Sequence, residues 1–118
     1  MKIINAKIHG YLDYGVVLAF LAAPSLFHFS GIPAAISYAL AGVHLALTLL
    51  TDFPLGALKW VPLKWHGIIE LIVGPILVAL PFALDFGSEP AAQYFYRVSG
   101  IVILIVWFLT DYGSAKKV

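Results

Sequence analysis

Residues 14–51 read YGVVLAFLAAPSLFHFSGIPAAISYALAGVHLALTLLT and contain no formally charged side chain. A membrane-spanning helix needs about 20 apolar residues, so this uncharged run is long enough for nearly two spans. The cluster Ser30-Gly31-Ile32-Pro33 divides it, because such residues favour a turn and Pro33 suits the first turn of a new helix. We therefore predict an antiparallel hairpin, with helices over about residues 7–29 and 33–51.

The second half of the chain repeats this plan. Asp52-Phe53-Pro54-Leu55-Gly56 ends the first hairpin, and further apolar runs predict helices over about residues 63–84 and 90–111. Lys59 and Trp60, between the hairpins, are typical of the membrane headgroup zone. The expected fold is all-α: an integral membrane four-helix bundle made of two tandem transmembrane hairpins, forming a single domain over residues 1–118.

The composition supports a lipid environment. The chain is 62% hydrophobic and 11% charged, whereas about a quarter of the residues in soluble domains are charged. The net charge is +1 with no basic block, which argues against a nucleic-acid partner, and the absence of Cys excludes disulfides and thiolate zinc sites. The sequence has no phosphate-binding Gly loop, serine nucleophile elbow or His-Glu-x-x-His motif, which disfavours a hydrolase or a nucleotide enzyme.

The distribution of basic residues predicts an orientation. Alternating helices place both chain ends and the central loop on one side of the membrane, and six of the seven Lys and Arg residues fall there. Arg97 is alone on the other side. Because positive residues collect on the cytoplasmic side, we expect both termini in the cytoplasm and the protein in a prokaryotic cytoplasmic membrane.

The two hairpins also resemble each other in sequence. Five residues of the first half match identical or similar residues 57 positions later, and further matches follow at offsets of 58 and 59 (His9, Gly10, Asp13, Pro24 and Phe29 with His66, Gly67, Glu70, Pro81 and Phe86; Tyr38 and Gly42 with Tyr96 and Gly100; Leu50-Thr51-Asp52-Phe53 with Leu109-Thr110-Asp111-Tyr112). We interpret the chain as an internal repeat, with units at about residues 7–56 and 64–113. Each unit contains an even number of spans, so the expected pseudo-two-fold axis runs along the membrane normal.

A small-residue-Pro stretch lies inside the first helix of each unit, as Ala22-Ala23-Pro24-Ser25 and as Ala79-Leu80-Pro81-Phe82. Two-helix units with such a stretch resemble the SPW-repeat membrane proteins. The resemblance implies a small polytopic membrane protein and brings no established activity with it.

Ionisable residues in these apolar runs are the candidate functional residues. His9 and Asp13 are four residues apart, as are His66 and Glu70, so each pair shares a helix face. The candidate group is completed by two carboxylates expected at helix ends and by one deeper histidine (Asp52, Asp111 and His44). His44 belongs to a small and polar stripe that we expect to face the bundle interior (Ser37, Ala41, His44, Thr48 and Thr51).

Three interpretations of this group remain open. The histidines could be structural, each bonded to a helix-end aspartate. Alternatively, the histidines and carboxylates together could bind a divalent transition metal, since imidazole and carboxylate ligands suit zinc, iron or manganese, as in di-metal bundles. In a variant of this interpretation, His9 and His66 are the two axial ligands of a haem. They could instead relay protons, from Asp52 through Thr48 to His44. The expected surroundings are the lipid bilayer, and small-residue stripes such as Ala35/Ala39 and Gly42/Ala46 would also permit a homo-oligomer.

Overall fold

The computed structural model describes residues 2–117 and contains all four expected helices. The elements in chain order are α1 (Ala6–Leu26), α2 (Gly31–Leu50), β1 (Thr51–Asp52), β2 (Val61–Pro62), α3 (Leu63–Ala83), α4 (Pro90–Leu109) and the 3-10 helix η1 (Tyr112–Lys117). The predicted helix ends differ from the observed ones by three residues or fewer. The two-residue strands were not predicted.

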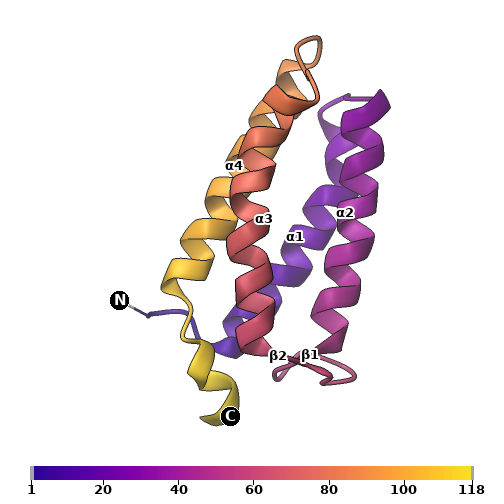
Figure 1. Ribbon diagram of the computed structural model, residues 1–118. Helices are drawn as coiled ribbons and strands as arrows, with labels where there is room; N and C mark the ends of the chain where they lie inside the picture. Colours follow the sequence, from indigo (N-terminus) through magenta and orange to yellow (C-terminus); the bar gives the residue numbers. More distant parts are fainter. Residues whose placement is uncertain (1, 118) are drawn as a thin grey trace.

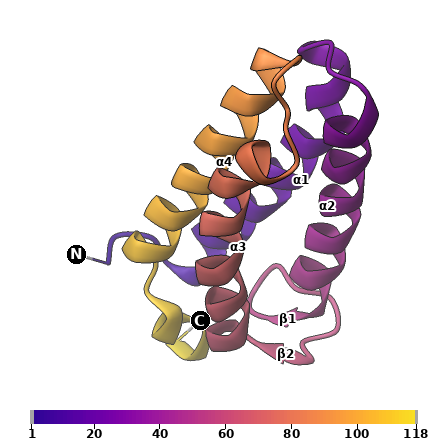
Figure 2. The same cartoon turned by 45° about the horizontal axis from the view of Figure 1, so that its top comes forward.

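The helices form two hairpins that lie side by side (Figure 1). α1 packs mainly against α2, and α3 packs mainly against α4. The start of α1, the β1–β2 pair and η1 lie at one end of the bundle, here called the η1 end, and the two tight interhelical turns lie at the other. Figure 2 shows the same arrangement from a second direction.

α1 and α3 end in the same way. His28 and Asp85 adopt left-handed backbone conformations, with φ of 56° and 52°. The next residues, Phe29 and Phe86, donate their N–H groups to carbonyls five residues back at 3.1 and 2.9 Å. This is the Schellman arrangement, in which the residue after the left-handed one also packs against the helix. Phe29 and Phe86 are accordingly buried and begin the apolar core between the hairpins.

The interior of the bundle is apolar over most of its length. Phe20, Leu77 and Tyr96 are each at most 3% exposed and belong to one core cluster. The Tyr96 hydroxyl donates to the carbonyl of Pro33 at 2.6 Å, which satisfies this buried polar group and links α4 to α2. The predicted inward stripe of α2 is confirmed, because it is buried apart from the partly exposed His44 (Ser37, Ala41, Thr48 and Thr51 are buried).

The outer surface is also apolar. Leu18, Val43 and Ile72 are each more than half exposed, although they lie on three different helices. α2, α3 and α4 are long and apolar enough to cross a membrane. Among the described residues, α1 does not meet that criterion, although we expected it to be a span. Its length is sufficient, but its first eight residues include Lys7, His9 and Asp13.

The small-residue stripe on α2 is exposed. Ala35, Ala39, Gly42 and Ala46 all lie on its outer face, and a Cβ built on Gly42 would contact nothing within 4 Å. Packing within the described chain therefore does not use this stripe.

Candidate metal centre

Four buried side chains from α1 and α3 meet near the η1 end of the bundle. They are His9 and Asp13 of α1 and His66 and Glu70 of α3, and each is at most 4% exposed. One ligand atom from each lies within 4.8 Å of all the others. The predicted pairing of each histidine with the carboxylate four residues later is confirmed. We call these four residues the quartet.

Each histidine of the quartet contacts both carboxylates. His9 Nε2 lies 3.2 Å from Asp13 Oδ1 and 2.8 Å from Glu70 Oε1. His66 Nε2 lies 3.0 Å from Asp13 Oδ2 and 2.5 Å from Glu70 Oε1. The quartet thus joins the two hairpins, because each carboxylate is shared between a histidine of its own helix and one of the other.

Two buried threonines hold the other ring nitrogen of each histidine. His66 Nδ1 lies 2.8 Å from Thr51 Oγ1, and His9 Nδ1 lies 2.8 Å from Thr110 Oγ1. Each threonine hydroxyl donates to the carbonyl four residues earlier in its helix, at 2.6 Å. Since this uses the hydroxyl hydrogen, the oxygen must accept from Nδ1–H of the histidine. Nδ1 is therefore protonated on both rings, and Nε2 faces the carboxylates.

The expected helix-end aspartates are not part of this group, and that prediction was wrong. Asp52 is exposed on β1. Asp111 is half-buried, and its Oδ1 accepts a hydrogen bond from the N–H of Gly113 at 3.0 Å. The residue before each aspartate reaches the histidine instead. α2 and α4 end at Leu50 and Leu109, so Thr51 and Thr110 are extended, and adjacent extended residues point in opposite directions.

Short parallel backbone pairings place each threonine beside its histidine. Thr51 pairs with Val61 in the β1–β2 ladder, and Thr110 pairs with Ile4 in an isolated parallel bridge. His66 and His9 follow these partners by five residues, one turn into the helices that begin there. Each pairing therefore joins the end of one hairpin to the beginning of the other.

Glycine follows each histidine because a ring packs there. A Cβ on Gly67 would lie 2.7 Å from Cε1 of Tyr112, and a Cβ on Gly10 would lie 2.8 Å from Cε2 of Phe53. Both contacts are closer than a real Cβ permits. The two aromatic rings thus close the quartet at the η1 end.

Tyr112 completes the wall of the site beside His9. The two ring centroids are 5.7 Å apart in an edge-on arrangement. Burial, and then the charges of Glu70 and Asp13, raise the pKa of Tyr112, so its phenol stays neutral. Its hydroxyl is buried and has no hydrogen-bond partner among the described residues.

His44 approaches the quartet from α2. Its Nε2 lies 3.5 Å from Asp13 Oδ1, and its side chain is 16% exposed. The prediction that His44 belongs with the site is supported by this contact. The expected path from Asp52 through Thr48 to His44 is not formed, because Thr48 donates to the backbone carbonyl of His44 and Asp52 is exposed elsewhere.

The charge of the quartet limits what it can do. Two buried carboxylates carry a charge of −2 when ionised and need compensation, because unpaired buried charges are costly. With Nδ1–H fixed, each Nε2 either carries a second proton or presents a lone pair to a cation. Two protons or one divalent cation would therefore neutralise the site equally.

Unmet hydrogen-bonding groups favour a cation. Asp13 Oδ2 and His66 Nε2 lie 3.0 Å apart, yet neither makes a hydrogen bond of acceptable geometry within the described chain. Buried polar atoms are nearly always paired, and a cation bound by both atoms would give each a partner in addition to their ion-pair contact. The Glu70 carboxylate lies between the two imidazoles, where a porphyrin would have to sit, so the site does not fit haem held by both histidines.

The chemistry of this centre is therefore judged on its own geometry. Comparison with protein-family models, with curated proteins and with solved structures found no match.

Proposed function

We propose that this chain is an integral membrane protein that holds one divalent transition metal ion, zinc, iron or manganese, in the quartet near the cytoplasmic face. The observation that carries the proposal is the convergence of four buried ligand atoms from two helices within 4.8 Å. Membrane insertion is supported by the apolar composition of α2, α3 and α4 and by their exposed apolar surfaces. We also propose a relationship to the SPW-repeat membrane proteins, on the small-residue-Pro stretches of α1 and α3.

The donor set favours a single ion. Two imidazole nitrogens and two carboxylates are a sufficient set for a four-coordinate zinc site, and the same ligands suit iron and manganese. A di-metal bundle uses more carboxylates, and the two candidates for that role, Asp52 and Asp111, lie outside the group. The threonine bonds to Nδ1 are the outer contacts that orient a metal-binding imidazole.

Charge balance gives the proposal a thermodynamic signature. If the metal-free quartet holds two imidazolium ions against two carboxylates, a divalent ion must displace two protons. Metal binding would then release about two protons per ion, because ligands must be deprotonated to bind. Calorimetry in buffers of different ionisation enthalpy measures that number directly.

The first experiment is the metal content of the detergent-purified protein beside a His9→Ala/His66→Ala variant. We expect one equivalent of metal in the wild type and none in the variant. His28→Asn and Asp52→Asn are matched controls, because both alter exposed residues outside the quartet and should retain the metal. Equal metal content in the wild type and the double variant would contradict the proposal.

A structural role is the second candidate, and one observation favours it. In the doubly protonated form the same contacts make a neutral network of ion pairs, which would fasten the hairpins without any ligand. A chelator separates the two roles. For a metal centre it should lower the melting temperature of the wild type and leave the double variant unchanged, whereas for an ion-pair network it should change neither.

A further inference from the structure

A small cavity adjoins the quartet on the α1/α4 side. It has a volume of about 60 Å³ and is lined by Asp13, Glu70 and His44 together with five apolar side chains of α1 and α4. A cavity of about 10–15 Å³ by this measure already holds one water molecule, so this cavity has room for a ligand of two or three heavy atoms. We call it the His44 cavity.

His44 supplies an unused polar group at this cavity. Its Nε2 atom is buried, lies 3.5 Å from Asp13 Oδ1, and makes no hydrogen bond within the described chain. Asp13, which is 3% exposed, also lines the cavity and presents its Oδ1 atom to His44. A buried imidazole nitrogen without a hydrogen bond, beside an open volume, indicates a position for a polar ligand.

The other half of the chain offers no equivalent of His44. Alignment of the two halves places Val102 or Ile103 opposite His44, and Ile103 is buried at 5% exposure. Both of these residues line the His44 cavity as hydrocarbon walls. His44 therefore makes the two halves of the chain unequal beside the quartet.

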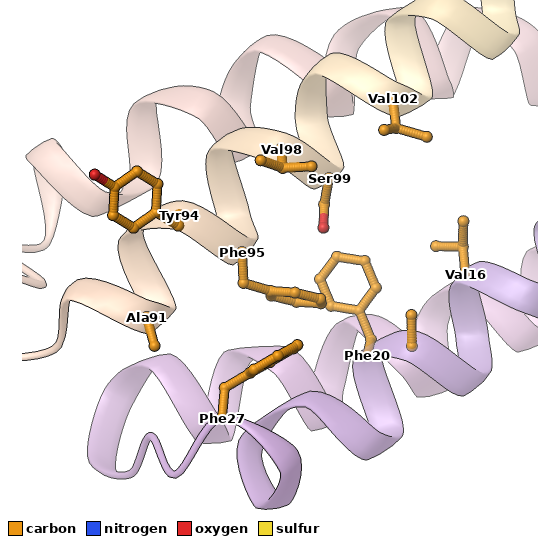
Figure 3. Close-up of a pocket in the computed structure, with 10 residues that line it drawn as sticks. Val16, Phe20, Phe27, Ala91, Tyr94, Phe95, Val98, Ser99 and Val102 are labelled. Atoms are coloured by element: carbon orange, nitrogen blue, oxygen red, sulfur yellow. The ribbon is translucent and has the colours of Figure 1, made fainter.

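An apolar groove leads to the His44 cavity. The groove lies between α1 and α4, has a volume of about 510 Å³, and shares Val16 and Val102 with the cavity. Figure 3 shows these two valines at one end, and Phe20, Phe27 and Phe95 towards the other. The groove therefore adjoins the His44 cavity on the side where α1 and α4 face outward.

We propose that the His44 cavity is the binding position of an exogenous ligand on the metal centre. The ligand is a molecule of two or three heavy atoms that binds the metal through one atom and hydrogen-bonds His44 through another. This inference rests on the proposed metal site and adds a fifth, exchangeable ligand to the four protein ligands, so that the centre is open rather than purely structural.

The test uses the cobalt(II)-loaded protein in detergent, with azide as the probe. The visible spectrum of cobalt responds to coordination, so we expect a saturable spectral change on addition of azide. His44→Val introduces the kind of residue found in the other half and should weaken azide binding at least tenfold while cobalt still binds. Val102→Phe should fill the cavity and have the same effect.

Ile105→Phe is the matched control, because Ile105 is half exposed on α4, like Val102, and lines neither the His44 cavity nor the groove. Its azide affinity should equal that of the wild type. If the wild type binds cobalt but its spectrum does not respond to azide, the inference about the His44 cavity is wrong, while the proposed metal site stands. The same conclusion follows if both His44→Val and Val102→Phe bind azide as tightly as the wild type. Failure of the wild type to bind cobalt would contradict the proposed metal site itself.

Discussion

Replacing Thr110 or Thr51 by valine should weaken metal binding without disturbing the backbone. Valine has nearly the same shape as threonine and favours the extended conformation found at both positions. The change removes only the oxygen that accepts the Nδ1–H of His9 or His66. The affected histidine is then left with a buried donor and is free to adopt the other tautomer.

The expected magnitude follows from these bonds. Leaving one buried donor unsatisfied costs about 1–3 kcal/mol of stability. Loss of an outer contact that orients a metal-binding histidine lowers metal affinity by about 10–100-fold. That range corresponds to about 1.4–2.8 kcal/mol of binding free energy. Because each threonine serves one histidine, Thr51→Val and Thr110→Val should give effects of similar size.

The assay is competition for zinc against a chromophoric chelator in detergent. Thr48→Val is the matched control, since Thr48 is also fully buried in α2, but its hydroxyl bonds only to the backbone carbonyl of His44. We expect the Thr48 variant to bind zinc as the wild type does. Wild-type zinc affinity in both Thr51→Val and Thr110→Val, or an equal loss in Thr48→Val, would refute the role of these bonds.

Three further predictions concern pH, packing and topology. Metal affinity should rise with pH, by up to about 100-fold per pH unit in the range where the metal displaces both imidazolium protons. A metal affinity that does not change with pH would contradict the displacement of protons by the metal. Gly100→Ala should lower the free energy of unfolding by about 1–3 kcal/mol in a denaturation assay, because its Cβ would lie 2.5 Å from the carbonyl oxygen of Gly74. Gly15→Ala, with nothing within 4 Å, should be neutral or slightly stabilising, and equal losses in both would be inconsistent with this reasoning. The chain has no native cysteine, so Ala57→Cys and Ser88→Cys can each be labelled with a reagent that does not cross membranes. We expect the reagent to label Ala57→Cys only from the cytoplasmic side and Ser88→Cys only from the other side. The reverse labelling pattern would contradict the proposed orientation.

Much of the fold could be predicted because its signals are local. Long apolar runs and turn residues gave the four helices, and four-residue spacing paired His9 with Asp13 and His66 with Glu70. That both pairs meet in one site followed from placing them at the same depth of two tandem hairpins. These inferences needed only the periodicity of a helix and the direction of each span.

The partners of Nδ1 could not be predicted, because they depend on where a helix stops. Helical spacing already placed Thr51 on the inward stripe of α2, but it placed Asp52 beside that stripe as the expected partner of a histidine. The extended conformation of Thr51 and Thr110 brings the threonine to the histidine and turns the next side chain away. The pairing of Ile4 with Thr110 joins residues more than a hundred positions apart, and no local pattern indicates such a contact. The β-branched residues at these positions were the only available signal.

The dependence of His9 on Thr110 has a consequence for biogenesis. α1 is synthesised first and α4 last, yet the hydrogen bond that orients the first histidine comes from the residue that follows α4. A nascent chain with only three helices inserted has all four ligands but lacks this bond and the backbone bridge that supports it. If the quartet holds the proposed ion in a membrane, full metal affinity would develop only after the last helix has packed, and loading of the centre would report completed assembly.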